Sequence, residues 1–285
     1  SDVVVVGDDA HGVSVELESV ESASIDVTVG DTLYVAGEGS VGIDIDADSL
    51  SNEGIVLVDI GSTVVVDGAD SRGLRLSSIS GDLGGSTQIK SDDIWYSSNG
   101  AALIETRGQT DFALTNYGIF TDSEGVNATP YLGGAGNDQI FNHGMFEGRL
   151  SLGQGVNRFV NYAGGAFYGG LSLDLGNEES VLENWGDFVL GELATPDTAV
   201  LTGNLFLGDT GIWYSAIDFN DNTADRIVVS GAARVSGTIH FGLLNANKIL
   251  PGVRSISLVE ASKPTDSPLP LPEQAPSGHL ASTAF

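Results

Sequence analysis

Four ring-bearing residues follow asparagines at related positions in the sequence and are the best candidates for ligand binding. They are Tyr117, His143, Tyr162 and Trp185. An outward column of such rings could stack on the sugar rings of a glycan or on a protein partner. If the rings turn inward or lie under a loop, they serve packing instead. The sequence leaves both interpretations open.

One segment matches a calcium-binding pattern. Residues 133–141, GGAGNDQIF, fit the nonapeptide in which backbone carbonyls and Asp oxygens of successive repeats share each ion. That motif needs several tandem copies, and the related stretch at 153–157 has Asn157 where the motif has Asp. An isolated copy more often forms a tight turn. Asp138 is therefore a weak calcium candidate, and we expect neither a metal site nor another cofactor.

No set of residues predicts catalysis. The four histidines lack metal-ligand spacing, and there is no cysteine. Acidic pairs such as Asp44 with Asp46, or Asp92 with Asp93, could form a glycosidase site on a solenoid. With 39 acidic residues, however, chance pairs are expected. Residues 37–42 match Gly-x-Gly-x-x-Gly, but no helix pattern follows, so they predict a turn. We expect no catalytic residues and no enzyme.

These residues lie within an internal repeat that reads Asn, a ring, Gly or another small residue, then Phe. Its copies begin at Asn116, Asn142, Asn161 and Asn184. Phe146, Phe167 and Phe188 fall 21 residues apart, and each unit holds three short alternating stretches separated by turns. Three such strands close one rung of a parallel β-helix. We therefore expect the phenylalanines to stack as one inward column.

The repeated asparagines have a structural explanation. Asn tolerates left-handed backbone geometry at turns. Stacked Asn side chains can also hydrogen-bond to each other and to turn amides along the ladder. The Asn column is thus expected to hold neighbouring rungs together and not to bind a ligand.

The sequence divides into three parts. Residues 1–197 predict β-helix rungs, with longer rungs of about thirty residues and larger loops in the N-terminal third. Residues 198–260 carry longer alternating strands and predict a capping segment with an autochaperone-like role. Residues 261–285 are proline-rich and predict a linker or disordered tail. The predicted fold is all-β, a single-stranded right-handed parallel β-helix (solenoid) with a C-terminal β cap.

Charge and composition exclude several function classes. Against 11 basic residues stand 39 acidic ones, so the net charge of −28 repels nucleic acids and anionic membranes. The absence of cysteine rules out disulfides and thiolate metal sites. No apolar run approaches the ~20 residues of a membrane-spanning helix. The first residues lack the basic region of a signal peptide, so we expect a mature fragment of an exported protein.

The repeats resemble the passenger domains of type V secretion autotransporters. The similarity lies in residues 133–167, GGAGNDQIFNHGMFEGRLSLGQGVNRFVNYAGGAF, and in 201–259, with ADRIVVSG at 224–231 and AARVSGTI at 232–239. Family membership implies a right-handed β-helix, a C-terminal folding nucleus, and export through a C-terminal outer-membrane barrel. An outer-membrane barrel needs at least eight strands. Only the proline-rich segment 261–285 follows the β segment, so we expect the barrel to be missing from this sequence.

We therefore expect an exported bacterial surface passenger, located at the cell surface or secreted. It is expected to be a monomer that serves adhesion or surface display and contacts a glycan or protein of a host or environmental surface. One alternative is a polysaccharide-degrading β-helix enzyme of the pectinase or tailspike type, and another is a structural stalk for a separate head. A deep groove with converging carboxylates would favour the enzyme, and a smooth exterior with an aromatic strip would favour adhesion.

Overall fold

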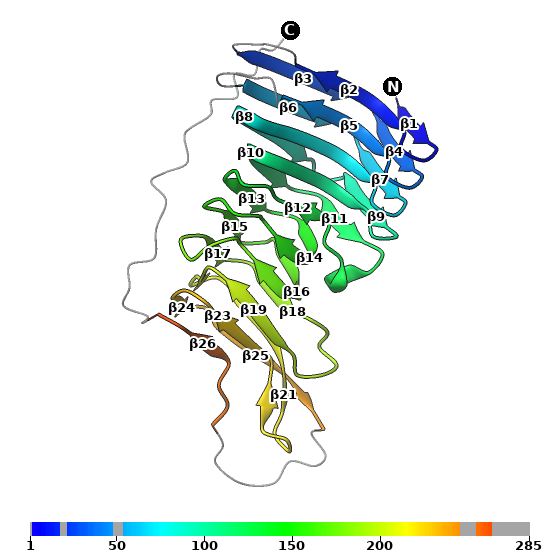
Figure 1. Ribbon diagram of the computed structural model, residues 1–285. Coiled ribbons are helices and arrows are strands. Elements are labelled where there is room, and N and C mark those ends of the chain that lie inside the picture. Colours follow the sequence, from blue (N-terminus) through cyan, green and yellow to red (C-terminus); the bar gives the residue numbers. More distant parts are fainter. Residues whose placement is uncertain (1, 18–21, 48–53, 246–254, 264–285) are drawn as a thin grey trace.

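The computed structural model describes residues 2–17, 22–47, 54–245 and 255–263. In these residues nearly all structure is β, and the strands stack in parallel as a three-faced solenoid (Figure 1). The one described helical turn is η1 (Gly125–Asn127). The predicted parallel β-solenoid is thus confirmed, whereas its right-handed sense stays a prediction. None of the described helices has the length and apolar character needed to span a membrane.

Three ladders run along the solenoid, one for each face. The first face comprises β1 (Val3–Val6), β4 (Thr32–Ala36), β7 (Thr63–Asp67), β9 (Ile94–Ser98), β11 (Ile119–Asp122), β14 (Met145–Ser151), β16 (Ala166–Asp174), β18 (Asp187–Leu190), β21 (Ile212–Asp218) and β25 (Thr238–Leu244). A short antiparallel strand, β22 (Thr223–Ala224), pairs with the end of β21.

The second face follows the first along the chain. It comprises β2 (His11–Glu16), β5 (Val41–Asp46), the first parts of β8 (Arg72–Ile89) and β10 (Ala102–Asn116), β12 (Tyr131–Leu132), the ends of β14 and β16, β19 (Thr198–Thr202), β23 (Arg226–Val229) and β26 (Val259–Ala261).

The third face closes each rung. It comprises β3 (Ala23–Val29), β6 (Gly54–Ile60), the ends of β8 and β10, β13 (Asp138–Asn142), β15 (Arg158–Asn161), β17 (Val181–Asn184), β20 (Asn204–Leu207) and β24 (Ala233–Val235). Because side chains alternate along each strand, every second residue of all three faces points into one shared core.

The predicted phenylalanine column is confirmed. Phe146 pairs in register with Phe167, and Phe167 with Phe188, and all three are buried. The rings of Phe167 and Phe188 stack with centroids 5.3 Å apart. The column also includes Phe120 of the first copy and continues beyond the repeat through Trp95 and Trp213.

The asparagine ladder is confirmed as well. The Nδ2 of Asn116 donates to the Oδ1 of Asn142, Asn142 donates in the same way to Asn161, and Asn161 to Asn184, each over 2.7 Å. The amides also bind the backbone of the adjoining turn, as when Asn184 Nδ2 donates to the carbonyl of Gly186 over 2.9 Å. These four side chains are fully buried, so they stabilise the stack.

The N-terminal rungs are longer, as expected. Val3 pairs with Leu33, and Leu33 with Val64, which gives a repeat of about thirty residues. Part of the extra length lies in four-residue turns between the first and second faces. In one of them, Gly37 has φ 121°, and a Cβ there would lie 2.2 Å from the carbonyl oxygen of Gly7. The Gly-x-Gly-x-x-Gly match at 37–42 is therefore a turn that stacks on its neighbour.

The segment expected to cap the solenoid is built as its last turns. Parallel pairing continues past residue 197, because β19 pairs with β16 and β20 with β17. β25 and β26 are the last described strands and pair with β21 and β23. A role of this segment as a folding nucleus stays a prediction. In the expected linker or tail at 261–285, residues 264–285 lie outside the described residues.

Candidate functional site

The predicted aromatic strip lies at the corner between the third and first faces. Tyr117, His143, Tyr162 and Trp185 each occupy the turn that follows a strand of the third face. Tyr117 is 43% exposed, and the other three are partly exposed. The sequence-predicted residues therefore share one outer edge of the solenoid.

The rings of this strip stack mainly on one another. Tyr117 and His143 have centroids 4.6 Å apart and planes 12° apart, and His143 and Tyr162 have centroids 4.2 Å apart and planes 3° apart. Both faces of His143 are therefore covered, and burial lowers its pKa. Because a sugar stacks on a ring face and not on a ring edge, the interior of this column offers little platform to a glycan.

Trp185 packs differently. Its ring meets Phe206 edge-on with centroids 5.0 Å apart, and its Nε1 donates to Glu183 Oε2 over 3.4 Å. A Cβ at Gly208 would lie 2.2 Å from the indole, so the ring rests on glycine backbone of the next rung. Trp185 is held against its own neighbours.

The weak calcium candidate points inward. Asp138 is fully buried, its backbone N–H donates to Asn157 Oδ1 over 2.6 Å, and Thr106 Oγ1 donates to its Oδ2 over 3.3 Å. Burial raises the pKa of Asp138 to about 8, with smaller opposing effects from hydrogen bonds. The carboxyl is therefore mostly protonated at neutral pH and is a poor calcium ligand. Within the described ranges, no three His, Cys, Asp or Glu side chains gather as a metal site.

One member of each acidic pair has a structural role. Asp44 receives two hydrogen bonds from Arg75, of 2.8 and 2.5 Å, and lies 3.0 Å from His11 Nδ1. The hydrogen bond that Arg75 donates to Asp44 raises the pKa of Arg75. Asp93 is buried and accepts the backbone N–H of Lys90 over 2.9 Å. These carboxylates hold rungs and turns in place.

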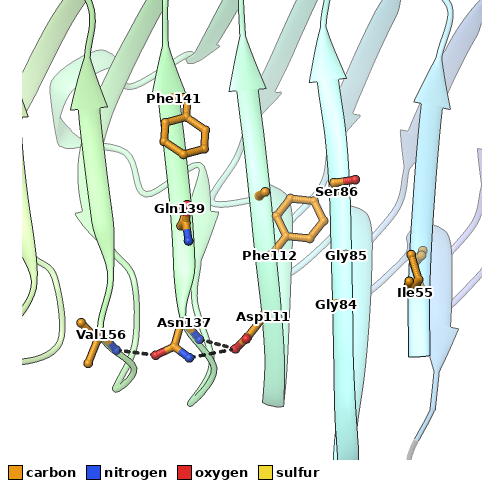
Figure 2. Close-up of a pocket in the computed structure, with 12 residues that line it drawn as sticks. Ile55, Gly84, Gly85, Ser86, Asp111, Phe112, Asn137, Gln139, Phe141 and Val156 are labelled. Carbon is orange, nitrogen blue, oxygen red and sulfur yellow. Dashed lines mark hydrogen bonds between the residues drawn. The ribbon is translucent and has the colours of Figure 1, made fainter. Parts of the chain in front are cut away.

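The structure shows a further site, an open groove on the third face that crosses β6, β8, β10, β13 and β15 (Figure 2). Its volume is about 670 Å³. Ile55 and Val156 stand at its two ends, and its middle is lined by small and polar residues. Between these two ends the lining includes Gly84, Ser86, Asp111, Ala113, Gln139 and Phe141.

The groove exists because its middle strands carry small outward residues. The register places Gly84 between Ile55 and Asp111, and Ser86 beside Ala113. At Gly84 an added Cβ would meet one atom within 4 Å, the carbonyl oxygen of Gly54 at 3.7 Å. At Gly85 an added Cβ would lie 2.7 Å from the ring of Phe112 in the core. Packing thus requires a glycine at 85 but not at 84.

One rim of the groove is held by a ladder of turn hydrogen bonds. Asn137 donates its backbone N–H and its Nδ2 to Asp111 Oδ1, over 2.6 and 3.3 Å, and Val156 N–H donates to Asn137 Oδ1 over 2.8 Å (Figure 2). Among the described residues that line the groove, Asp111 is the single carboxylate. The rim is therefore preorganised, and no second acid faces Asp111 among these described residues.

Sequence reasoning missed this groove. Its floor depends on how strands separated by about thirty residues are placed in register, and small outward residues leave no chemical pattern of their own. A signal exists in retrospect: Gly84, Ser86 and Ala113 interrupt the outward row that larger residues such as Leu57 and Gln139 fill in neighbouring strands.

Comparisons with known proteins gave no match: none was found among protein-family models, curated proteins or solved structures. The functional argument therefore rests on the residues of this chain.

Proposed function

We propose that this chain is an exported passenger of the autotransporter type that acts at the bacterial cell surface by adhesion and not by catalysis. The observation that carries the proposal is the open groove on the third face, whose described lining residues include binding groups and one carboxylate. The repeat that resembles autotransporter passengers does stack as a parallel solenoid, which supports the same conclusion.

The competing enzyme hypothesis needs an acid pair. Glycoside hydrolysis uses two carboxyl groups on either side of the scissile bond, about 5–10 Å apart. In the groove, Asp111 is engaged by Asn137 and has no second carboxylate opposite it among the described lining residues. Outside it, Asp44 is engaged by Arg75. Binding without bond cleavage is the function that this arrangement supports best.

The charge of the chain restricts its partners. A net charge of −28 disfavours anionic surfaces and nucleic acids. We therefore propose a monomer that adheres to uncharged or cationic groups on a host or environmental surface.

Adhesion is tested with the purified chain on intact host cells, on extracellular-matrix proteins and on an array of immobilised glycans, together with an assay for released reducing ends. The expected result is saturable binding with no release of sugar. Release of reducing ends that is lost in Asp111→Asn would establish the enzyme instead. Failure to bind any of the three surfaces would contradict the adhesive function.

Surface exposure is tested separately. The chain is given a secretion signal and fused to the barrel of an autotransporter, and intact cells are treated with protease. We expect the chain to become accessible outside the cell, and retention inside the cell would contradict the passenger assignment.

A further inference from the structure

We propose that the groove across β6, β8, β10, β13 and β15 binds a linear oligosaccharide that carries no anionic groups. This inference rests on the proposed adhesive function and names the ligand class of its site. It concerns the third face and not the aromatic strip at the corner.

The shape of the groove calls for an extended ligand. It reaches across five adjacent rungs, from Ile55 on β6 to Val156 in the turn before β15, and at roughly 4.8 Å between rungs this is a length of about 19 Å. Small-molecule sites normally enclose most of their ligand, whereas this groove lies open on a sheet face. A chain of several sugar units that lies across the strands fits such a surface.

The polar groups suit hydroxyls. Among the described residues, no side-chain hydrogen bond engages Ser86 or Gln139, so the hydroxyl of Ser86 and the amide of Gln139 remain to donate to and accept from a ligand. Asp111 uses Oδ1 for Asn137, and its Oδ2 can accept a further hydroxyl. Ile55 is 67% exposed and adds apolar surface against which the C–H groups of a sugar ring can pack. Phe141 adds a smaller apolar surface, because the guanidinium of Arg158 lies over its ring.

The charge of the site excludes acidic sugars. Among the described lining residues there is no Lys or Arg, whereas Asp111 is one of them. The guanidinium of Arg158 lies 6.0 Å from the ring of Phe141, but it is already paired with Glu183 over 2.7 Å. On a chain of net charge −28, a uronate or sulfate placed here would meet repulsion without a counter-charge. A peptide strand has no unpaired edge to join, because each groove-lining strand already pairs on both sides.

Replacing Gly84 by a larger residue tests ligand binding in the groove, because the substitution leaves the core undisturbed. The backbone φ of Gly84 is not positive, and an added Cβ meets no atom closer than 3.7 Å. Gly84→Val should therefore fold normally and fill the floor of the groove. Ala113 is partly exposed on the outer side of β10 and lines the groove, so Ala113→Leu should fill the floor in the same way. Ser172→Val is the matched control, since Ser172 is exposed on β16 of the second face, outside the groove lining.

Binding is measured by isothermal titration with neutral hexasaccharides (cellohexaose, maltohexaose and N-acetylchitohexaose) and with an anionic galacturonate hexamer. We expect at least one neutral hexasaccharide to bind and the galacturonate not to bind. Gly84→Val and Ala113→Leu should each weaken binding by at least about tenfold, or ~1.4 kcal/mol, while Ser172→Val binds as the parent chain does. Urea unfolding of each variant verifies that the fold is kept.

The outcomes separate this inference from the adhesive function. Binding that survives in Gly84→Val but is lost in Tyr162→Ala would move the site to the aromatic strip and overturn the groove, with adhesion intact. Preference for galacturonate, or no binding of any neutral hexasaccharide, would overturn the inference even if the chain adheres to cells. Loss of adhesion to every surface would remove the function as well.

Discussion

The third face holds one backbone arrangement from the first rungs to the last, yet its early and middle rungs fill the same inward position with opposite chemistry. At the end of each strand the register places, in order, Val29, Ile60 and Ile89, then Asn116, Asn142, Asn161 and Asn184, then Leu207. The early rungs use aliphatic side chains there, and the middle rungs use a hydrogen-bonded ladder.

A second inward column changes one rung later. At the start of the strands the register places, in order, Ile25, Val56, Gly85, Phe112 and Asp138. The backbone N–H of Asp138 donates to Asn157, and the backbone N–H of Asn157 donates to Ser180. The first column therefore becomes polar between β8 and β10, and the second between β10 and β13. The comparison teaches that a buried polar side chain is tolerated in this core where its neighbours in the column are polar as well, because each then satisfies the next.

The largest expected effect comes from placing an amide side chain among aliphatic neighbours in this column. Ile60→Asn loses buried aliphatic packing, worth ~2–5 kcal/mol, and leaves an amide unpaired at a further ~1–3 kcal/mol. In Leu207→Asn the same packing is lost, but Asn184 can donate to the new amide. Urea unfolding should therefore show that Ile60→Asn costs more stability than Leu207→Asn, and equal losses would contradict the neighbour rule.

The next largest effect concerns the aromatic core of the middle rungs. Phe167 stacks between Phe146 and Phe188 and is fully buried. Phe167→Ala should lower the free energy of unfolding by ~3–5 kcal/mol. A loss below ~1 kcal/mol, outside the range for a buried aromatic ring, would mean that the ring is not part of the core. Tyr168→Ala, next to it but pointing outward, is the control and should cost less.

Asp138 gives the middle rungs a pH response. Its pKa is raised to about 8 in the folded chain, whereas an unfolded Asp has a pKa of ~3.9. Between these values the folded form binds the proton more tightly, so the stability that protonated Asp138 contributes declines as pH rises from about 4 to 8. Asp138→Asn removes this contribution. The stability difference between parent and variant should therefore change with pH by up to ~1.4 kcal/mol per unit, and a constant difference would contradict the buried carboxyl.

Much of the fold could be predicted from the sequence, because the middle rungs repeat distinctive residues. Asn and Phe recur at related positions in successive copies, so the sequence predicts both columns. The early rungs repeat Val and Ile, which are common in any strand, and so gave only a loose pattern. The aromatic column beyond Phe146 and Phe188 was missed because rungs of other lengths place Trp95 and Trp213 outside the 21-residue spacing.

The candidate site was harder to predict. Residue types located the aromatic strip, but they could not show that its rings cover one another. The residues around Asp138 match a calcium-binding sequence motif. Because side chains alternate along the strand, however, the carboxyl of Asp138 points into the core. The groove depends on Gly84, where the informative feature is a missing side chain, and only the strand register reveals what that absence opens.

The smallest expected effect tests a ladder that belongs to the early rungs. Their turns between the first and second faces are joined by serines: Ser71 Oγ donates to the carbonyl of Gly37, and Ser40 N–H donates to Ser71 Oγ over 3.2 Å. In the middle rungs β14 and β16 run through this corner without a turn, so no such ladder is needed there.

Because Ser71 is fully buried, Ser71→Ala leaves two backbone groups unpaired, and we expect a loss of ~1–3 kcal/mol in the free energy of unfolding. Ser172→Ala, an exposed serine of β16, serves as the control and should stay within ~0.5 kcal/mol of the parent. If both substitutions cost the same, the early rungs hold their turns by backbone stacking alone, and the contrast between the two regions is confined to the third face.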